Sequence, residues 1–443
     1  MKSTPRMAFL LRIFLALATA ACLAPPAAWA QLQIQITSGV SHPVPIAIVP
    51  FAEAPTDGTD VAGVIQHDLV GSGRFTALAR SQMPGTPTHA ANVKFADWKA
   101  AGSDYVVVGR VVPGAAPGQL AVEFNLLNTL TGQSIARQRF VGTAAALRNA
   151  AHRVSDVIYQ AITGIRGAFA TRIAYVALVG QGASQKFQLV VADADGYNQH
   201  LILQSRFPIM SPTWSPNGQW IAYVSFENHL PAVYVQRVLT GQRTMVSERA
   251  GINGAPAWSP GGHRLALTLS GVSGHPQIYV LNLRNQHLTR ITHAPAINTE
   301  ADWAPDGKSI YFTSDRAGEP QIYKIGITPG SIPQRITFTD EYNAGPHVSP
   351  DGKLLAMVTR DNSGNYCIAV QNLQTGEFRI LTHGPIDQSP SFAPNGATII
   401  YAARPGNASA GILATISVDG LTGLSLKPTQ GEVRDPAWGP FTK

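Results

Sequence analysis

The sequence predicts a mainly β fold: a six-bladed β-propeller closed by the C-terminal strand, preceded by a smaller α/β domain. Three observations predict it. A short turn phrase recurs at nearly constant spacing through the second half of the chain, several short apolar runs fit into each period, and the first part has helical periodicity but no repeat. A period of roughly 40–45 residues carrying about four strands is typical of a propeller blade.

The turn phrase pairs a large residue with a following Pro-Asn/Asp/Gly-Gly turn, as in Pro-Thr-Trp-Ser-Pro-Asn-Gly from Pro212. Its large residue stands at Trp214, Trp258, Trp303, Val348, Phe392 and Trp438, so the steps are 44, 45, 45, 44 and 46 residues. Proline presets φ and glycine supplies the positive φ that such tight turns require. Each phrase therefore predicts the link between the first and second strands of a blade.

Six phrases are followed by only five complete units, and this mismatch predicts how the ring closes. The segment 172–176 (Arg-Ile-Ala-Tyr-Val) matches 220–224 (Trp-Ile-Ala-Tyr-Val) but has no phrase before it, whereas the phrase at 435–441 has no unit after it. Joining the two makes a sixth blade whose inner strand comes from the C-terminus. Closure of this kind removes the open sheet edges that a linear stack would expose.

Residues 1–30 have the pattern of a secretory signal peptide. Lys2, Arg6 and Arg12 supply its basic part, residues 7–23 are apolar, and Ala28-Trp29-Ala30 predicts cleavage after Ala30. We therefore expect a secreted chain rather than a membrane span. A lipoprotein anchored at Cys22 is the alternative, but the residues before Cys22 lack the expected Leu or Val.

Residues 31–165 are expected to form the α/β domain, and residues 166–443 the propeller. Strands are predicted at 44–50, 105–112, 120–127 and 134–141, and helices at 61–69 and 95–101. A longer amphipathic helix is predicted at 144–162, because its apolar positions form one stripe. That stripe consists of Leu147, Ala151, Val154, Ile158 and Ile162.

Composition excludes several classes of function. The net charge of +7 falls to +4 when three leader cations are removed, and no basic cluster of the kind that binds nucleic acid is present.

Cys367 is the only cysteine after the leader, and we expect a buried core residue there. No Gly-x-Ser-x-Gly motif is present. Gly307-Lys308-Ser309 and Asp193-Ala194-Asp195-Gly196 are interpreted as blade turns rather than phosphate or calcium loops.

His293 and His383 occupy equivalent repeat positions, and we interpret them as strand-end residues rather than metal ligands. No cofactor and no catalytic or metal-binding residue is predicted. The remaining candidate site is the mouth of the ring, where the residues just before each inner strand should gather. Five positions before the large residue stand Asn253, Asn298, Asn343 and Asp387, and three before it stand Ala255 and Glu300. Their side chains could bind an inserted peptide, or could instead satisfy turn backbone in their own blade.

With these features in place, the mature chain resembles the TolB family of the Tol–Pal cell-envelope system. Matching stretches include the start at 33–40, Pro-Ile-Ala-Ile-Val-Pro-Phe at 45–51, Asp-Ala-Asp-Gly-Tyr-Asn-Gln at 193–199 and Ser-Asp-Arg-Ala-Gly at 314–318. The resemblance implies a non-enzymatic, monomeric adaptor that supports envelope integrity and outer-membrane invagination during division. It implies two partners: the lipoprotein Pal at the propeller mouth, and TolA at the N-terminal strand.

The resemblance carries the Pal contact to Asn253, Gly254, Ala255, Thr299 and Glu300, and the register adds Asn298, Asn343 and Asp387. Ile252 stands where the family commonly has His, which leaves the contact on that blade open. The TolA segment alternates apolar and polar residues, as an edge strand does. It comprises Gln31, Leu32, Gln33, Ile34, Gln35, Ile36, Thr37, Ser38, Gly39 and Val40.

Two other functions fit the residues. A propeller lactonase or glycan hydrolase would use channel carboxylates, for which Glu300, Asp387 and Asp435 are the candidates. A general scaffold would bind other envelope proteins at the same mouth. Spacing links the three acids to no mechanism, so we favour the adaptor.

Overall fold

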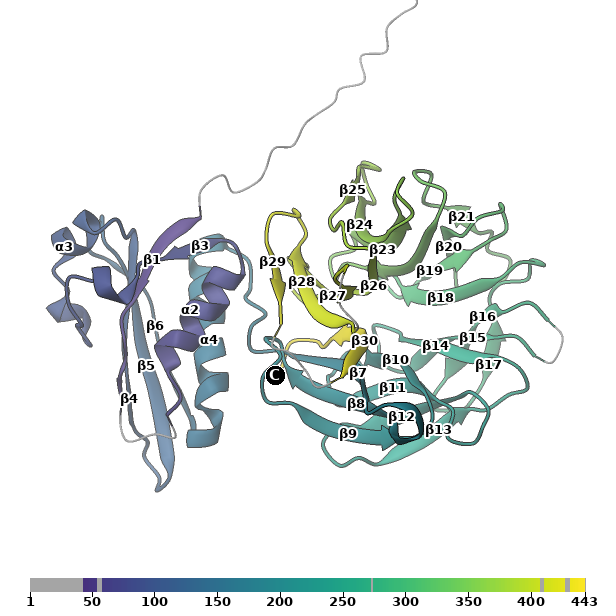
Figure 1. The fold of residues 1–443 in the computed structure, drawn as a ribbon, viewed down its shortest axis with the longest axis horizontal. Helices are drawn as coiled ribbons and strands as arrows, with labels where there is room; N and C mark the ends of the chain where they lie inside the picture. Colours follow the sequence, from purple (N-terminus) through teal and green to yellow (C-terminus); the bar gives the residue numbers. More distant parts are fainter. Residues whose placement is uncertain (1–42, 54–57, 272–273, 407–409, 427–430, 443) are drawn as a thin grey trace, which may run out of the picture. The chain divides into compact units, whose positions relative to one another are not determined.

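A sheet covered by helices comes first along the chain, and a series of small antiparallel sheets follows, in the computed structural model (Figure 1). The structure describes residues 43–53, 58–271, 274–406, 410–426 and 431–442. The predicted signal peptide and the segment 31–40 lie outside these residues. Among the described helices, none combines the length and apolar character needed to cross a membrane.

The first domain is an α/β unit with strand order β3-β1-β4-β5-β6. Strand β1 is parallel to β3 and β4, whereas β4, β5 and β6 are antiparallel. The elements are β1 (Val44–Ile48), β2 (Ala52–Glu53), α2 (Val61–Gly71), β3 (Phe75–Ala77), η1 (Arg80–Gln82), η2 (Ala90–Asn92), α3 (Phe95–Ala100), β4 (Tyr105–Pro113), β5 (Gln119–Asn128), β6 (Ser134–Thr143), η3 (Ala144–Ala146) and α4 (Leu147–Thr163). Every strand and helix predicted in this domain is present.

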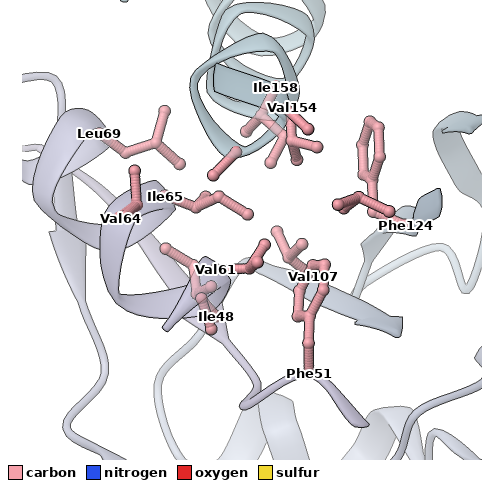
Figure 2. Packing of buried hydrophobic residues seen from close by; sticks show 14 of the residues in the cluster. Ile48, Phe51, Val61, Val64, Ile65, Leu69, Val107, Phe124, Val154 and Ile158 are labelled. Atoms are coloured by element: carbon pink, nitrogen blue, oxygen red, sulfur yellow. The ribbon is translucent and has the colours of Figure 1, made fainter. Parts of the chain in front are cut away.

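Helices α2 and α4 pack on one face of this sheet (Figure 2). Asp60 caps α2 by accepting a hydrogen bond from the Gly63 amide at 2.9 Å, and Gly164 ends α4 in a left-handed conformation. Ile65 and Ile158 meet Val107 of the sheet in a core where all three are fully buried. Burying each such side chain stabilises the fold by about 1.5–3 kcal/mol.

The second domain contains six four-stranded sets among the described residues, which we call blades 1 to 6. Blades 4 and 5 share one sheet through a single parallel pair, Tyr366 with Ile386. Blade 1 contains β10 (Ile209–Trp214), β11 (Trp220–Ser225), β12 (Ala232–Arg237) and β13 (Arg243–Ser247). Blade 2 contains β14 (Asn253–Trp258), β15 (Arg264–Leu269), β16 (Gln277–Asn282) and β17 (Leu288–Arg290). Blade 3 contains β18 (Asn298–Trp303), β19 (Ser309–Ser314), β20 (Gln321–Gly326) and β21 (Gln334–Arg335).

The remaining blades follow the same order except for the last. Blade 4 contains β22 (Asn343–Val348), β23 (Leu354–Arg360), β24 (Tyr366–Asn372) and β25 (Phe378–Ile380). Blade 5 contains β26 (Ile386–Phe392), β27 (Thr398–Arg404), β28 (Ile412–Ser417) and β29 (Gly423–Ser425). Blade 6 combines β30 (Glu432–Trp438) with β7 (Arg172–Val179), β8 (Lys186–Asp193) and β9 (His200–Ser205), and η4 (Gly182–Ser184) lies between β7 and β8. Strand β30 thus pairs with β7, as the unmatched phrase and unit predicted.

The repeated turn phrase forms the link that its composition predicts. In blades 1 to 5 its glycine has a positive φ of 66–72°, at Gly218, Gly262, Gly307, Gly352 and Gly396. Gly307-Lys308-Ser309 is therefore such a turn, and Asp193-Ala194-Asp195-Gly196 forms the turn between β8 and β9. Cys367 is fully buried in β24, as predicted.

Candidate binding site at the propeller mouth

The first strand of every blade is interrupted by a bulge three residues before the large residue of the turn phrase. Register shifts occur in all six, for example between Thr299 and Asp302 in blade 3. The residue inside each bulge has a φ of 43–61°, and these residues are Ser211, Ala255, Glu300, Gly345, Ser389 and Asp435. Five of the six are not glycine, and strained backbone of this kind is concentrated at functional sites in proteins.

Side chains at the bulges link neighbouring blades in a polar chain. Glu300 Oε2 accepts hydrogen bonds from the Gly345 amide at 3.1 Å and from the Thr313 hydroxyl at 2.9 Å. Ser389 Oγ donates to Asp435 Oδ1 at 3.2 Å, and Asp435 Oδ2 accepts from the Ser211 amide at 3.0 Å. Blades 3 and 4, 5 and 6, and 6 and 1 are therefore joined at the mouth.

A cavity of about 190 Å³ lies within this ring, lined by residues of the six first strands that include Glu300, Asp302, His347 and Asp435. Of the residues that line this cavity, Asp302 accepts a hydrogen bond through Oδ2 from the Val348 amide at 2.7 Å. Burial raises the pKa of Asp302 despite this hydrogen bond and the neighbouring His347. A preformed polar cavity of this size suits one or a few side chains of an inserted segment.

A second set of contacts joins four pairs of neighbouring blades, one residue before the large residue of the turn phrase. Where this residue is Ala257 or Ala437, the indole of the next blade donates to its carbonyl, from Trp303 at 3.1 Å and from Trp214 at 3.2 Å. Where it is Asp302 or Ser391, its side chain accepts from the backbone amide of the next large residue instead. Sequence reasoning missed these residues, although their constant position beside the large residue could have indicated them.

The small polar residues predicted for the mouth divide into two groups. Asn253, Asn298, Asn343 and Asp387 are at most 3% exposed. Asn253 Oδ1 accepts from the Ser247 hydroxyl at 2.7 Å and from the Arg249 amide at 3.0 Å. Asn298 Nδ2 donates to the Ala296 carbonyl at 3.0 Å, and Asp387 accepts from the Gly384 amide at 3.2 Å. Asn343 Nδ2 likewise donates to the Thr339 carbonyl at 2.7 Å, while Asn343 Oδ1 is buried without a hydrogen-bond partner among the described residues. These side chains therefore bond mainly to the segments that lead into their own first strands, which agrees with the second of the two readings offered by the sequence.

The other predicted residues lie nearer the surface. Gly254, Ala255 and Thr299 are partly exposed, and Glu300 is exposed. Ile252 and Ile297 stand at equivalent positions of blades 2 and 3 and are 46% and 45% exposed. Blades 2 and 3 therefore combine accessible apolar side chains with the Glu300 carboxylate, which is the mixture that protein interfaces use.

The three acids proposed for catalysis are not brought together as a set. Glu300 and Asp435 line the cavity, and each accepts the amide of the following blade. Asp387 is buried against Gly384, and burial raises the pKa of its carboxyl group. The geometry thus gives each acid a structural partner of its own.

Comparison with known proteins agrees with this architecture. The models of the TolB amino-terminal domain and the TolB beta propeller domain match residues 32–135 and 159–442. The Tol-Pal system protein TolB of Thioalkalivibrio sulfidiphilus is 48% identical over 95% of this chain and 96% of that protein. The corresponding protein of Methylococcus capsulatus is 49% identical, over 93% and 95%.

The crystal structure of TolB from Acinetobacter baumannii is similar to this chain with a TM-score of 0.83 and 40% identity. The match covers 90% of this chain and 97% of that one. Both domains and nearly the whole length are therefore shared with relatives well above 30% identity. The chain belongs to the TolB family of Tol–Pal system proteins.

Proposed function

We propose that this chain is a periplasmic, non-enzymatic adaptor of the Tol–Pal system that binds the lipoprotein Pal at the propeller mouth. The observation that carries the proposal is the mouth itself: a rigid ring of left-handed bulges around a polar cavity, beside the exposed Ile252, Ile297 and Glu300. A preformed site loses little conformational entropy when it binds a segment of a partner. Membership of a family of Tol–Pal system proteins supports Pal as that partner.

The structure narrows the residues expected to contact Pal. Gly254, Ala255, Thr299 and Glu300 present accessible atoms, whereas Asn253, Asn298, Asn343 and Asp387 are buried. We therefore assign the second group the role of fixing the loops that carry the first. Ile252 gives blade 2 an apolar contact in place of the His that the family commonly has there.

Calorimetric titration of residues 31–443 with the soluble domain of the organism's own Pal tests this assignment. Glu300→Gln removes one charge but retains acceptors for Thr313 and Gly345, and Thr299→Ile adds bulk beside the cavity. Each is expected to weaken binding tenfold or more, which corresponds to about 1.4 kcal/mol. Glu377→Gln, on the exposed turn between β24 and β25, is the matched control and should bind like the unaltered chain.

Tight Pal binding that is weakened by neither Glu300→Gln nor Thr299→Ile would mean that the Pal site lies elsewhere on the chain. No binding by a folded chain would remove the adaptor function and restore the hydrolase alternative.

The proposal also assigns residues 31–40 to TolA by strand addition, in which an extended segment pairs with the edge of a partner's sheet. Deletion of residues 31–40 should abolish TolA binding and leave Pal binding intact. We further propose that Pal at the mouth changes the availability of this strand. Coupling of this kind is reciprocal, so saturation with Pal must change the affinity for TolA by the same factor by which TolA changes the affinity for Pal. Unchanged affinities would refute the coupling.

A further inference from the structure

A histidine is buried between carboxylates that come from the two domains. His152 of α4 is 1% exposed, and its Nδ1 lies 2.8 Å from Oδ2 of Asp68 in α2. Its Nε2 lies 3.5 Å from Oδ2 of Asp195, which belongs to the turn between β8 and β9 of the propeller. This Nε2 has no hydrogen-bond partner although it is buried.

The charges around His152 favour its protonated form. Arg148, one turn earlier on α4, forms an ion pair with Asp195 and stacks on the ring of Tyr197. With a neutral imidazole, Asp68, Asp195 and Arg148 together carry a buried charge of −1, whereas an imidazolium makes the group neutral. Asp193 of β8 and Asp156 of α4 are the other titratable groups that act on the site.

The geometry leads to the same protonation state. A neutral imidazole that donates from Nδ1 to Asp68 would turn the lone pair of Nε2 towards the Asp195 carboxylate, which is repulsive. Protonation converts Nε2 into a donor that faces this carboxylate. Burial alone would lower the pKa of His152, but the charge of Asp68 and its hydrogen bond, together with Asp195 and Asp193, raise the pKa above its ordinary value.

We propose that His152 is a proton-operated clamp between the α/β domain and the propeller. Its imidazolium bridges Asp68 of one domain and Asp195 of the other, and loss of the proton removes this bridge and leaves Asp195 in contact with Arg148. This device is independent of the proposed Pal and TolA sites, because it concerns only the joint between the two domains.

A divalent cation fits the same place less well than a proton. Asp68, His152 and Asp195 offer three possible ligand atoms within 4.8 Å of one another. However, Asp68 already holds Nδ1, and Arg148 pairs with the same oxygen of Asp195 that a cation would need. The guanidinium of Arg148 would also repel the divalent cation.

The sign of the pH effect follows from the raised pKa. The stabilising contribution of His152 is complete below its unfolded value near 6.5 and is lost as the pH rises through the folded value. The clamp is therefore strongest in acid and weakens towards alkaline pH, where Arg148 alone of these two cations still pairs with Asp195.

The first test measures the pKa of the His152 imidazole by NMR titration of residues 31–443, with the signal assigned through His152→Gln. The clamp requires a value above 6.5, and a value at or below 6.5 would overturn it. Asp195→Asn is expected to lower this pKa, because Asp195 is one of the charges that raise it. His200→Gln, an exposed histidine of β9, should leave the His152 titration unchanged.

The second test measures the distance between spin labels on the two domains, at Leu130→Cys and Leu239→Cys. These side chains are 72% and 89% exposed, and the native Cys367 is buried. In the unaltered chain, the distribution of label-to-label distances should be narrow at pH 5.5 and broader at pH 9. In Asp195→Asn, and in His152→Gln if that variant folds, the distribution should be broad at both pH values. A distribution that does not change with pH, or that changes equally in the variants, would overturn the clamp. Stoichiometric zinc binding that His152→Gln abolishes would overturn it in favour of a metal site.

Discussion

The indole–carbonyl bonds between blades can be measured by comparing two tryptophans at equivalent repeat positions. Trp303 Nε1 donates to the Ala257 carbonyl of the preceding blade at 3.1 Å, whereas Trp258 Nε1 is buried without a partner. Trp303→Phe and Trp258→Phe remove the same atoms, so the loss of apolar contact is similar in the two variants. Only the first substitution also removes a hydrogen bond between blades.

The expected difference follows from the energetics of hydrogen bonds. A typical intramolecular bond contributes about 0.5–1.5 kcal/mol, and a buried unsatisfied donor costs about 1–3 kcal/mol. Trp303→Phe loses the stabilising hydrogen bond, whereas Trp258→Phe removes the buried donor that has no partner. We therefore expect Trp303→Phe to be less stable than Trp258→Phe by about 2 kcal/mol. The deeper burial of Trp303, which is 4% exposed whereas Trp258 is partly exposed, acts in the same direction.

Differential scanning calorimetry of residues 31–443 is the assay, and the melting temperature of the propeller transition is the quantity compared. A difference of about 2 kcal/mol corresponds to roughly 3–4 °C in a domain of this size. Equal melting temperatures, or a lower value for Trp258→Phe, would refute the assignment of stability to this bond.

Three further predictions concern single positions. Burial raises the pKa of Asp156 to about 6, so its ionisation costs stability as the pH rises from about 4 to above 6; Asp156→Asn should therefore raise the melting temperature more at pH 8 than at pH 4, and an equal change at both would contradict this. Burial raises the pKa of the Cys367 thiol to about 11, so iodoacetamide at pH 8 should label the unfolded but not the folded chain. Gly345→Ala should cost about 1 kcal/mol or less, because its Cβ would meet open space and the five equivalent residues of the other blades already carry a Cβ. Gly431→Ala would instead place a Cβ 1.9 Å from the Leu178 carbonyl oxygen and should disrupt blade 6. Equal chemical unfolding curves for the two variants would contradict these two predictions.

The elements of the fold could be predicted because each depends on local sequence. The turn phrase states where each first strand ends, and the stripe from Leu147 to Ile158 identifies the buried face of α4. The left-handed bulges could not be predicted, since Ser, Ala, Glu and Asp do not usually adopt a positive φ. Of the six residues inside the bulges, only Gly345 is of a type that commonly adopts a positive φ.

The candidate site shows the same limit. The repeat register predicts both Asn253 and Glu300 at the mouth, but it does not reveal that Asn253 is buried against the segment before blade 2 and that Glu300 is exposed. The His152 cluster was beyond reach, because Asp68 precedes it by 84 residues and Asp195 had been interpreted only as a turn residue. Contacts between distant segments depend on packing, which no local pattern records.

Hydrogen–deuterium exchange of residues 31–443, with and without the soluble domain of Pal, tests the central claim most directly. The adaptor account predicts slower exchange in the segments that lead into the first strands of blades 2 and 3, around Ile252 to Ala255 and Ile297 to Glu300. The turns at the other end of these blades, around Gly262 and Gly307, should exchange as before. Protection confined to the α/β domain, or to those turns, would contradict binding at the mouth.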